Sequence, residues 1–290
     1  MSTLAIDPGG AIPVLRDSEF EKIRALAYEH FGLDLRGGKQ GLVAARLGKK
    51  LRELGLKSFG EYFDLVVSDQ SGVQLATMVD YLTTNHTNFF REPRHFDFLC
   101  STILPTLRSR SQIHIWSAAC SSGEEPFSIA MSLLEEQPNL EGRVKIRATD
   151  ISTRVLQKGS LGVYGADRCM GITEALMRKY MLQGKNGAVG SYRFKPELRA
   201  MIQFERLNLM ETLPPGYRCS VIFCRNIMIY FDKPTQQGLV QRLSAQLEDG
   251  GYLFIGHSES LNSITHGLEY VSPATYRKPG GLSPGQTGRA

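Results

Sequence analysis

The 290-residue sequence lacks several features that define whole classes of protein. It has no run of eighteen apolar residues, so neither a transmembrane helix nor direct insertion into a membrane is expected. Its first residues do not combine a basic start with a continuous apolar block, which argues against a secretory signal. Its five cysteines are scattered and odd in number. They predict reduced thiols in a cytoplasmic protein rather than disulfides.

Other absences limit the chemistry. The six histidines are too scattered to suggest a set of ligands, so no metal is expected. The Gly-x-Gly-x-x-Gly turn of nicotinamide enzymes is missing, which argues against a reductase. A net charge of +5 permits a polyanionic partner without requiring one. With 42% hydrophobic and 22% charged residues, the chain has the composition of a globular protein of one large or two modest domains.

The N-terminal part of the chain has helical patterns only. Residues 1–16 and 279–290 are rich in small and turn-forming residues and are predicted to be disordered. Residues 17–85 predict a small all-α domain, followed by a linker at 86–110. Its expected helices run from a cap at Asp17 or Ser18 to His30, from Lys39 to Leu54, from Phe59 to Val67 after a cap at Ser58, and from Gly72 to Thr83.

Residues 111–278 alternate strands with helices, which predicts an α/β domain with a mostly parallel sheet and helices on both faces. The expected strands are Ile113–Ala118, Val144–Thr149, Cys219–Cys224, Tyr252–Ile255 and a closing strand at Tyr270–Arg277. The expected helices are Pro126–Glu136, Ser152–Lys158 and Thr235–Leu247. Between about 162 and 207 this alternation breaks. A helix at Thr173–Leu182 and two strand-like runs, Ser191–Lys195 and Met201–Leu207, predict a small antiparallel β-insertion.

The most informative stretch is IHIWSAACSSGEEPFS, at 113–128. A buried strand gives way to a turn of small residues and then to a helix that begins with Glu124 and Glu125, the arrangement that cradles nucleotide-type ligands. Bare backbone amides at a helix start would suit a pyrophosphate. An acidic cradle instead suits a ligand with hydroxyls and a positive charge, such as S-adenosylmethionine.

Three polar clusters follow strands, where ligands of parallel sheets bind. They are the turn to Glu125, Asp150 after VKIRAT, and Arg225 with Asn226 after SVIFC. Asp150 is placed to accept the two hydroxyls of a ribose. Each cluster also has an ordinary structural explanation. The two glutamates can be first-turn acids favoured by the helix dipole, Asp150 a helix cap, and Asn226 a turn residue.

A fourth segment, TTNHTNFFREPRHF at 83–96, combines aromatic anchors with the polar residues Asn85, Thr87 and Arg91. A connecting segment so rich in aromatic and polar side chains is expected to have a functional role. The alternative is that it only holds the two domains together.

Six motifs in this order and spacing resemble the CheR-type chemoreceptor glutamate methyltransferases: TTNHTNFFREP, WSAACSSGEEPFSIAM, ATDIS, LNLMETLP, IFCRNIMIYFD and GGYLFIGHSESL. The resemblance covers residues 17–278. It implies a Rossmann-like class I S-adenosylmethionine-dependent methyltransferase sheet with a small antiparallel β-insertion, preceded by a small all-α domain. It also implies methyl transfer to glutamates of chemoreceptor cytoplasmic helices, which yields glutamyl methyl esters and S-adenosylhomocysteine and serves sensory adaptation in chemotaxis.

The resemblance implies roles for individual residues. The cofactor contacts are Asn85, Thr87, Arg91, Glu125, Asp150, Asn208, Leu209, Arg225 and Asn226. Arg91 and Tyr230 are expected nearest the transferred methyl group. The target carboxylate, with an ordinary pKa of about 4.3, is already ionised at neutral pH, so no general base is needed. Arg91 can orient that carboxylate through its planar guanidinium.

The helical domain suggests how the substrate docks. Seven basic residues and one acid lie between Arg36 and Lys57, and Lys39, Arg46 and Lys50 share one helix face. We expect Arg46, Lys49 and Lys50 to steer an acidic receptor helix, with an ordinary solvated face as the alternative. In some members of this family the β-insertion also binds a pentapeptide at the receptor C-terminus, and the resemblance leaves open whether this chain does so. A monomer is expected.

Two further alternatives remain. The basic helix and a pI of about 8.9 would suit a nucleic-acid methyltransferase. Such enzymes usually carry an Asp/Asn-Pro-Pro-Tyr/Phe motif after the fourth strand, where this chain has Arg225-Asn226-Ile227-Met228. A non-enzymatic cofactor sensor would bind the ligand without turnover, but the complete polar set argues against it.

Overall fold

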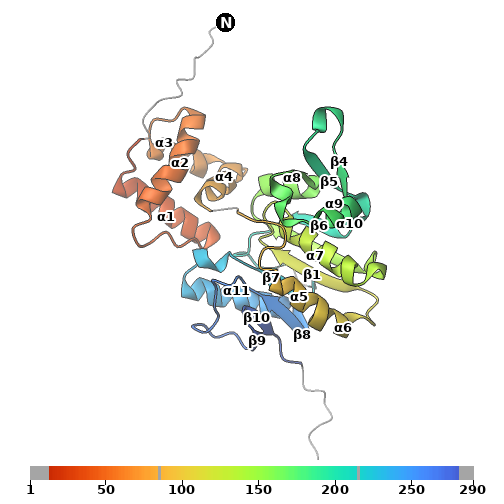
Figure 1. Cartoon of the computed structure of the whole chain (residues 1–290). Coiled ribbons are helices and arrows are strands. Elements are labelled where there is room, and N and C mark those ends of the chain that lie inside the picture. Colours follow the sequence, from red (N-terminus) through yellow and green to blue (C-terminus); the bar gives the residue numbers. More distant parts are fainter. Residues whose placement is uncertain (1–12, 84–85, 214–215, 281–290) are drawn as a thin grey trace, which may run out of the picture. The chain divides into compact units, whose positions relative to one another are not determined.

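The computed structural model describes residues 13–83, 86–213 and 216–280. The chain forms two compact units, a helical unit at Met1–Asn85 and a sheet unit at His86–Ala290 (Figure 1). Within the described ranges, no helix has both the length and the apolar character needed to span a membrane.

The described part of the helical unit, residues 13–83, forms the helices α1 (Asp17–Phe31), α2 (Gln40–Leu54), α3 (Phe59–Ser68) and α4 (Val73–Leu82). Their apolar faces meet in a core that includes Ile23, Leu47, Phe59 and Met78, each fully buried. The helical periodicity therefore predicts this unit well. Leu54, in the last turn of α2, lies outside this core and is 39% exposed.

Helix caps differ in part from expectation. Ser58 caps α3 as expected, because its hydroxyl accepts a hydrogen bond from the Glu61 amide at 3.1 Å. The cap of α1 is not Asp17 or Ser18 but Arg16. The Glu19 carboxylate accepts a hydrogen bond from the Arg16 amide at 3.0 Å, so a side chain inside the helix satisfies the backbone in front of it.

The sheet unit is built on a seven-stranded sheet in the order β6-β2-β1-β7-β8-β10-β9. The five strands from β6 to β8 run parallel, and β10 and β9 are antiparallel additions at one edge. The strands are β1 (Ile113–Ala118), β2 (Val144–Asp150), β6 (Ile202–Arg206), β7 (Cys219–Cys224), β8 (Leu247–Phe254), β9 (Glu269–Ser272) and β10 (Thr275–Arg277). The expected closing strand is thus a hairpin.

Helices lie on both sides of this sheet, as the alternating pattern predicts. Helix α7 (Glu124–Glu136) packs on the face that carries Ile115, Ile146 and Phe223, and α8 (Thr153–Leu161) covers β2 and β6. Helix α11 (Lys233–Gln246) packs against β8. The predicted α/β class is confirmed, and most strand residues are buried because both faces are covered.

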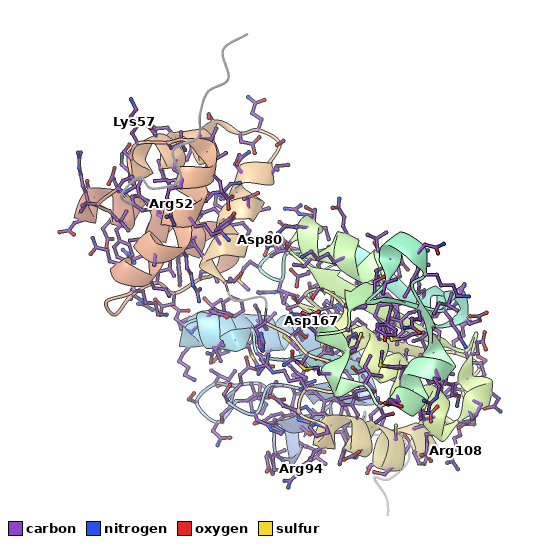
Figure 2. The ribbon with its side chains drawn as sticks, turned by 45° about the horizontal axis from the view of Figure 1, so that its top comes forward. Arg52, Lys57, Asp80, Arg94, Arg108 and Asp167 are labelled. Carbon is purple, nitrogen blue, oxygen red and sulfur yellow. The ribbon has the colours of Figure 1, made fainter. Side chains whose placement is uncertain are left out.

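The segment expected as a linker is instead part of the sheet unit. Residues 94–107 form a continuous helical stretch of α5 (Arg94–Phe98), a π-helical turn η1 (Leu99–Ile103) and α6 (Leu104–Leu107). Figure 2 labels Arg94 and Arg108, which mark its two ends. Phe96, Leu99 and Ile103 are buried in the core with α7. Their burial explains the correction, because an apolar stripe of this kind must be covered.

The β-insertion is smaller than expected. A separate antiparallel sheet, in the order β3-β5-β4, consists of β3 (Val163–Gly165), β5 (Ser191–Phe194) and β4 (Met181–Gln183). The short helices η3 (Arg168–Gly171), α9 (Glu174–Tyr180), η4 (Asn186–Ala188) and α10 (Pro196–Ala200) connect its strands and lead out of it. The run at 201–207 does not belong to it: Ile202–Arg206 pairs with β2 in the large sheet. The remaining short helices are η2 (Pro138–Leu140) and η5 (Met228–Tyr230).

Candidate functional site

The candidate site lies at the carboxyl ends of β1, β2 and β7, three neighbouring parallel strands. The chain leaves β1 toward α7 and β2 toward α8, and it reaches β7 on the other side of β1 only later. This change of direction is a topological switch point, where loops part and leave room for a ligand. All three polar clusters predicted from the sequence lie here.

The turn after β1 is tightly folded against the end of β2. Ala119, Ser121 and Gly123 have φ values of 62°, 49° and 96°, in the left-handed region. Asp150 fixes this turn, because its carboxylate accepts hydrogen bonds from the amides of Ser121 at 2.9 Å and Ser152 at 3.0 Å. A Cβ on Gly123 would lie 3.0 Å from the Gly159 Cα, so this position requires glycine.

The three acids of this region differ in their structural roles. Asp150 does not cap α8, since the Ser152 hydroxyl accepts the hydrogen bond from the Val155 amide. Glu124 and Glu125 do lie in the first turn of α7, where the helix dipole favours them. Glu124 is fully buried and is paired with Arg168, whereas Glu125 accepts a hydrogen bond from the Ser117 hydroxyl at 2.6 Å.

Arg225 joins the separate segments of the site. Its guanidinium lies 3.1 Å from the Glu125 carboxylate and 2.8 Å from the Glu92 carboxylate, and it donates to the Arg91 carbonyl oxygen at 2.5 Å. The Arg225 side chain is only 2% exposed. A buried guanidinium of this kind requires such partners, so Arg225 holds α7 and the Arg91 segment together.

Asn226 is held in an uncommon backbone conformation, with φ at 59°. The backbone amide of Asn226 donates to the Glu259 carboxylate at 2.9 Å. The same carboxylate accepts from the backbone amides of Met228 at 2.7 Å and Gly256 at 2.5 Å. A Cβ on Gly256 would lie 2.3 Å from the Asn226 Nδ2 atom. The turn expected at Asn226 therefore exists and is enforced from β8.

Burial and the neighbouring charges set the ionisation of these acids. Burial raises the pKa of Glu125, and the attraction of Arg225 and the Ser117 hydrogen bond offset this only in part. Burial also acts to raise the pKa of Glu92, but Arg225 outweighs it and the pKa lies below its ordinary value. For Glu259, burial raises the pKa and the backbone amides oppose it.

The segment after β6 lies beside Asp150. The Leu207 amide donates to the Asp150 carbonyl oxygen at 3.0 Å. Asn208 closes a local turn by accepting from the Met210 amide at 3.0 Å, and Arg242 holds the carbonyl oxygen of the buried Leu209 at 2.8 Å. Asn208 and Leu209 thus follow directly on the strand that neighbours the predicted ribose-binding acid.

The remaining predicted residues are placed as follows. Thr87 is buried, and its carbonyl oxygen accepts from Arg168 at 3.2 Å. Arg91 is partly exposed and donates to the His86 carbonyl oxygen at 3.1 Å. Tyr230 is partly exposed at the end of η5, four residues after Asn226. Asn85 lies outside the described residues.

Sequence reasoning missed three residues that hold this site together: Glu92, Arg168 and Glu259. Glu92 and Glu259 stand within motifs that carried the resemblance, FFREP and GHSESL. Their partners lie 133 and 33 positions away in the chain. No local pattern predicts such pairings, so only the fold could reveal them.

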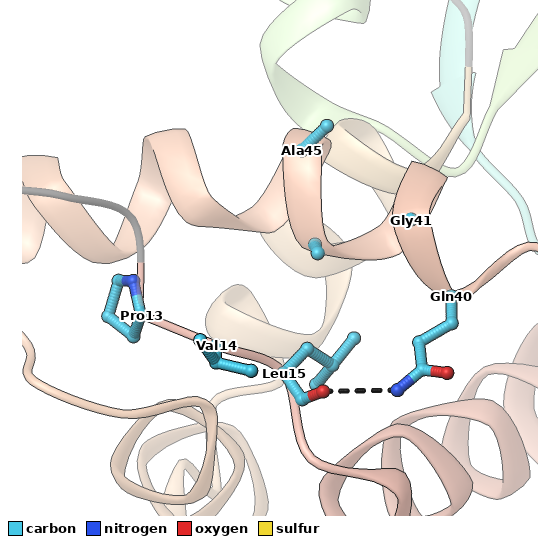
Figure 3. A pocket seen from close by; sticks show the side chains of 7 residues that line it. Pro13, Val14, Leu15, Gln40, Gly41 and Ala45 are labelled. Carbon is cyan, nitrogen blue, oxygen red and sulfur yellow. Dashed lines mark hydrogen bonds between the residues drawn. The ribbon is translucent and has the colours of Figure 1, made fainter.

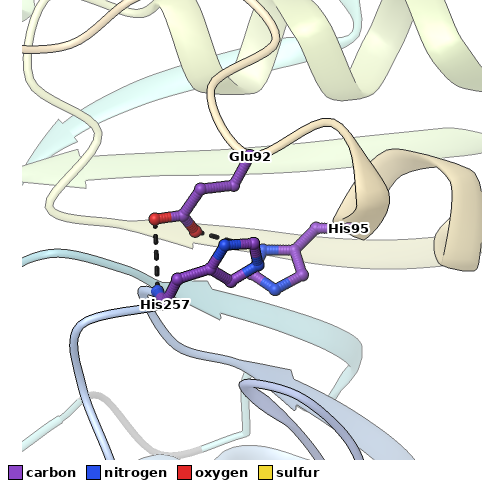
Figure 4. Close-up of side chains that lie close together, drawn as sticks. All are labelled: Glu92, His95 and His257. Carbon is purple, nitrogen blue, oxygen red and sulfur yellow. Dashed lines mark hydrogen bonds and ion pairs between the residues drawn. The ribbon is translucent and has the colours of Figure 1, made fainter.

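Figure 4 shows Glu92 with His95 and His257, the one grouping with metal-ligand spacing found in the described parts of the chain. The Glu92 carboxylate already accepts hydrogen bonds from Arg225 at 2.8 Å and the His257 amide at 3.2 Å. A divalent cation on it would lie beside a buried guanidinium, which like-charge repulsion disfavours. We therefore assign no metal to this grouping.

The residues predicted to dock the substrate lie in the helical unit. Arg46 donates to the Leu82 carbonyl oxygen at the end of α4, and Lys50 lies 3.6 Å from Glu53 and over the Tyr81 ring. Lys49 is exposed, as are Arg52 and Lys57, which Figure 2 labels. Arg46 and Lys50 are therefore engaged within the unit.

The helical unit also has a hollow of about 420 Å³, lined by Pro13, Val14, Leu15, Gln40, Gly41, Ala44 and Ala45. Figure 3 shows the Gln40 amide directed at the Leu15 carbonyl oxygen, 3.0 Å away. Its lining is mostly aliphatic and includes no acid, base or nucleophile, so this hollow offers no chemistry.

The site in the sheet unit fits S-adenosylmethionine by its donor set. Asp150 offers carboxylate oxygens suited to ribose hydroxyls, and Glu125 is an acid of only 14% side-chain exposure suited to a cationic group. Glu92, Arg225 and Glu125 together carry one net negative charge when ionised, which a cationic ligand would neutralise.

Two family models match the chain. The model described as "CheR methyltransferase, all-alpha domain" matches residues 18–83, and "CheR methyltransferase, SAM binding domain" matches residues 85–277.

Similar proteins are described as chemotaxis protein methyltransferases. A chemotaxis protein methyltransferase of Borreliella burgdorferi is 41% identical over 269 residues, covering 90% of this chain and 94% of that protein. Chemotaxis protein methyltransferase 2 of Pseudomonas aeruginosa is 39% identical, covering 89% and 92%. The chemotaxis protein methyltransferase of Escherichia coli is 38% identical, covering 86% and 87%.

Proposed function

The chain belongs to the CheR methyltransferase family, and we propose that it transfers the methyl group of S-adenosylmethionine to glutamate side chains of chemoreceptor cytoplasmic helices. Family membership makes the chain an S-adenosylmethionine-dependent methyltransferase of chemotaxis, as the sequence motifs predict. The nucleic-acid alternative gains no support, because the end of β7 is occupied by the ion-paired Arg225 and the turn at Asn226.

The observation that carries the proposal is the buried assembly of Arg225 with Glu92 and Glu125 at the switch point of the sheet. Isolated ion pairs of this burial are costly, since each charge loses its hydration. Their occurrence at the same edge of the sheet as Asp150, and in contact with the Arg91 carbonyl oxygen, supports a site for a cationic cofactor rather than a purely structural cluster.

S-adenosylmethionine supplies a methyl group on a positively charged sulfur. The proposed part of Asp150 is to hold the ribose, and that of Glu125 is to hold a cationic group of the cofactor. Asn208 and Leu209 are proposed beside the adenine, and Arg225 fixes Glu125 by their contact at 3.1 Å.

The acceptor needs orientation more than activation. A glutamate carboxylate is ionised at neutral pH and is a competent nucleophile without a base. Arg91 is proposed to hold one carboxylate oxygen so that the other faces the methyl carbon, and Tyr230 is proposed to border the same space. Such alignment contributes up to about 7–11 kcal/mol in favourable intramolecular models. Arg91→Ala should then lower kcat more than it weakens cofactor binding. Equal losses would reduce Arg91 to a cofactor contact.

Receptor docking is proposed on α2 of the helical unit. Because Arg46 and Lys50 are engaged within that unit, the exposed Lys49 and Arg52 are better placed to meet an acidic helix. Charge reversal at Lys49 and Arg52 should raise the KM for receptor, mainly at low salt. Unchanged methylation at low salt would end the docking proposal.

Tethering through a receptor C-terminal pentapeptide is proposed at the β-insertion. Strand β4 is an edge of the three-stranded sheet, and its Leu182 is 52% exposed. An extended peptide could pair with this edge, which would raise the local enzyme concentration. Calorimetry with such a peptide tests this point, and absence of heat at high micromolar concentration removes it.

The deciding experiment is a transfer assay with tritiated S-adenosylmethionine and membranes that contain chemoreceptors. Base-labile label on the receptor band is expected, because methyl esters hydrolyse in base. Label on added nucleic acid instead would support the alternative substrate. Cofactor binding without label on any acceptor would support a sensor.

A further inference from the structure

The segment that carries Arg91 is fixed by contacts that the cofactor motifs alone do not explain. Glu92, the next residue, lies where three distant parts of the sheet unit meet. Its carboxylate accepts hydrogen bonds from the Arg225 guanidinium at 2.8 and 3.2 Å, from the Asn226 side chain at 3.4 Å and from the His257 amide at 3.2 Å. One carboxylate thus connects the end of β7 and the end of β8 to the Arg91 segment.

The backbone around Arg91 is held in an unusual shape. Phe90 and Glu92, its two neighbours, have φ values of 54° and 57°. Non-glycine residues adopt this region only when their surroundings enforce it. Here the Phe90 amide donates to the Ser128 hydroxyl at 2.9 Å, and the Arg91 carbonyl oxygen accepts from Arg225. Hydrogen bonds therefore fix Arg91 from both sides.

Apolar packing already anchors this segment to the fold. Phe89 and Phe96 are 3% and 4% exposed and belong to the main core of the sheet unit. The Glu92 side chain, at 14% exposure, lies above this core and among the polar groups of the site. Its contacts therefore serve the arrangement of the site more than the folding of the segment.

Glu92 also determines how Arg225 is shared. With Glu92 in place, the guanidinium divides its donors between two carboxylates, and Glu125 keeps bonding capacity for a ligand. Without the Glu92 charge, Arg225 could pair with Glu125 alone in the bidentate geometry that guanidinium favours. The neighbouring His95 cannot take the place of the Glu92 charge, because an imidazole never carries a negative charge in this pH range, and burial and the nearby Arg225 lower its pKa to about 4 and keep it neutral.

We propose that Glu92 is a positioning residue of the methyl-transfer site, which divides Arg225 between two carboxylates and fixes Arg91 and Asn226 for the cofactor. This inference rests on the proposed function. It assigns to Glu92 no contact with the methyl group and no proton transfer.

The test is calorimetry of S-adenosylmethionine and S-adenosylhomocysteine binding to the full-length chain, with thermal unfolding measured in parallel. Glu92→Gln keeps the shape of the side chain and removes its charge. We expect its Kd for S-adenosylmethionine to rise about tenfold or more, since hydrogen bonds to charged groups are lost. Glu248→Gln is the matched control. Glu248 bridges Arg110 and Ser220 at the opposite end of β7, so its loss should leave the Kd unchanged.

A pH series separates positioning from a merely structural role. The groups that face Glu125 are Arg225, Glu92, the Ser117 hydroxyl and the buried thiols of Cys120 and Cys224. The Glu92 charge raises the pKa of Glu125 by repulsion. Cofactor affinity should fall on the acidic side as Glu125 becomes protonated, and we call this part of the pH profile the acidic limb. In Glu92→Gln the acidic limb should therefore move to lower pH. A role in stability alone would lower the unfolding temperature and leave that limb in place.

The other outcomes also test the role of Glu92. Wild-type affinity with an unmoved acidic limb in Glu92→Gln would overturn the inference. Should that variant not fold, Glu92→Asp keeps the charge but is one methylene shorter. For Glu92→Asp we then expect a higher Kd for S-adenosylmethionine with the acidic limb unmoved. A Kd equal to that of the wild type would contradict the inference. Failure of the wild-type chain to bind either ligand would instead remove the proposed function.

Discussion

Removal of the Arg225 guanidinium is the most informative single perturbation of this protein. Arg225→Met keeps a long apolar stem and deletes the charge that lies 2.8 Å from Glu92 and 3.1 Å from Glu125. The arginine side chain is 2% exposed and the two acids are 14% exposed, so water can replace few of the lost interactions. Two carboxylates would then remain close together without a counter-charge.

The size of the effect follows from this burial. Breaking a buried ion pair by deletion of one partner costs about 3–5 kcal/mol. For a domain of about 200 residues, each kcal/mol lowers the unfolding temperature by about 2–4 °C, so a decrease of about 6–20 °C is expected. The control is Arg110→Met, which removes the partner of Glu248. Arg110 is 41% exposed, and its pair contributes about 0–1 kcal/mol.

The destabilisation should depend on pH. In the wild type, the pKa of Glu92 is lowered, so Glu92 stabilises the fold at neutral pH and loses this contribution as pH falls through that value. Without Arg225 the pKa of both acids rises, because burial then acts unopposed by a nearby cation. Protonation at mildly acidic pH would relieve the variant, and the gap in unfolding free energy from wild type should narrow.

The assay is thermal and urea unfolding of both variants at neutral and at mildly acidic pH, with and without S-adenosylhomocysteine. Destabilisation of Arg225→Met no greater than that of Arg110→Met would refute the reasoning. So would a destabilisation that grows as the pH falls.

Three further predictions follow. Gly256→Ala should weaken cofactor binding measured by calorimetry, because the added Cβ lies 2.3 Å from Asn226 Nδ2, whereas Gly41→Ala in open space should not. Asp150→Asn should raise the Kd about tenfold, since an amide cannot accept both backbone hydrogen bonds as the carboxylate does, and an unchanged Kd would exclude a ribose role. Arg46→Gln should lower the unfolding free energy of the helical unit by about 1 kcal/mol, because the hydrogen bond to the Leu82 carbonyl oxygen is lost. Urea unfolding measures this change, and cofactor affinity should change little.

The local sequence predicts those strands and helices whose residue pattern identifies them without information from distant residues. The strands Ile113–Ala118 and Cys219–Cys224 have the bounds expected of them, because an apolar run between turn residues identifies a buried strand. Residues 86–110 are expected as a linker because their aromatic anchors stand between two regions of regular pattern, and only the fold shows that 94–107 are helical and packed in the core of the sheet unit. Ile202–Arg206 was misassigned because a strand of five residues gives no indication of which sheet it joins.

The sequence by itself determined the family, the cofactor and the three strand ends at which polar residues gather. Motif order and strand–turn–helix patterns are local properties, and each depends on residues a few positions apart. Only the tertiary structure decided which side chains meet. Glu92 and Arg225 are 133 positions apart, and Asn226 and Glu259 are 33 apart, yet each pair is in hydrogen-bond contact. Parallel strands bring their carboxyl ends to one edge of the sheet whatever their separation in the chain, so charge sharing at the site depends on the completed fold.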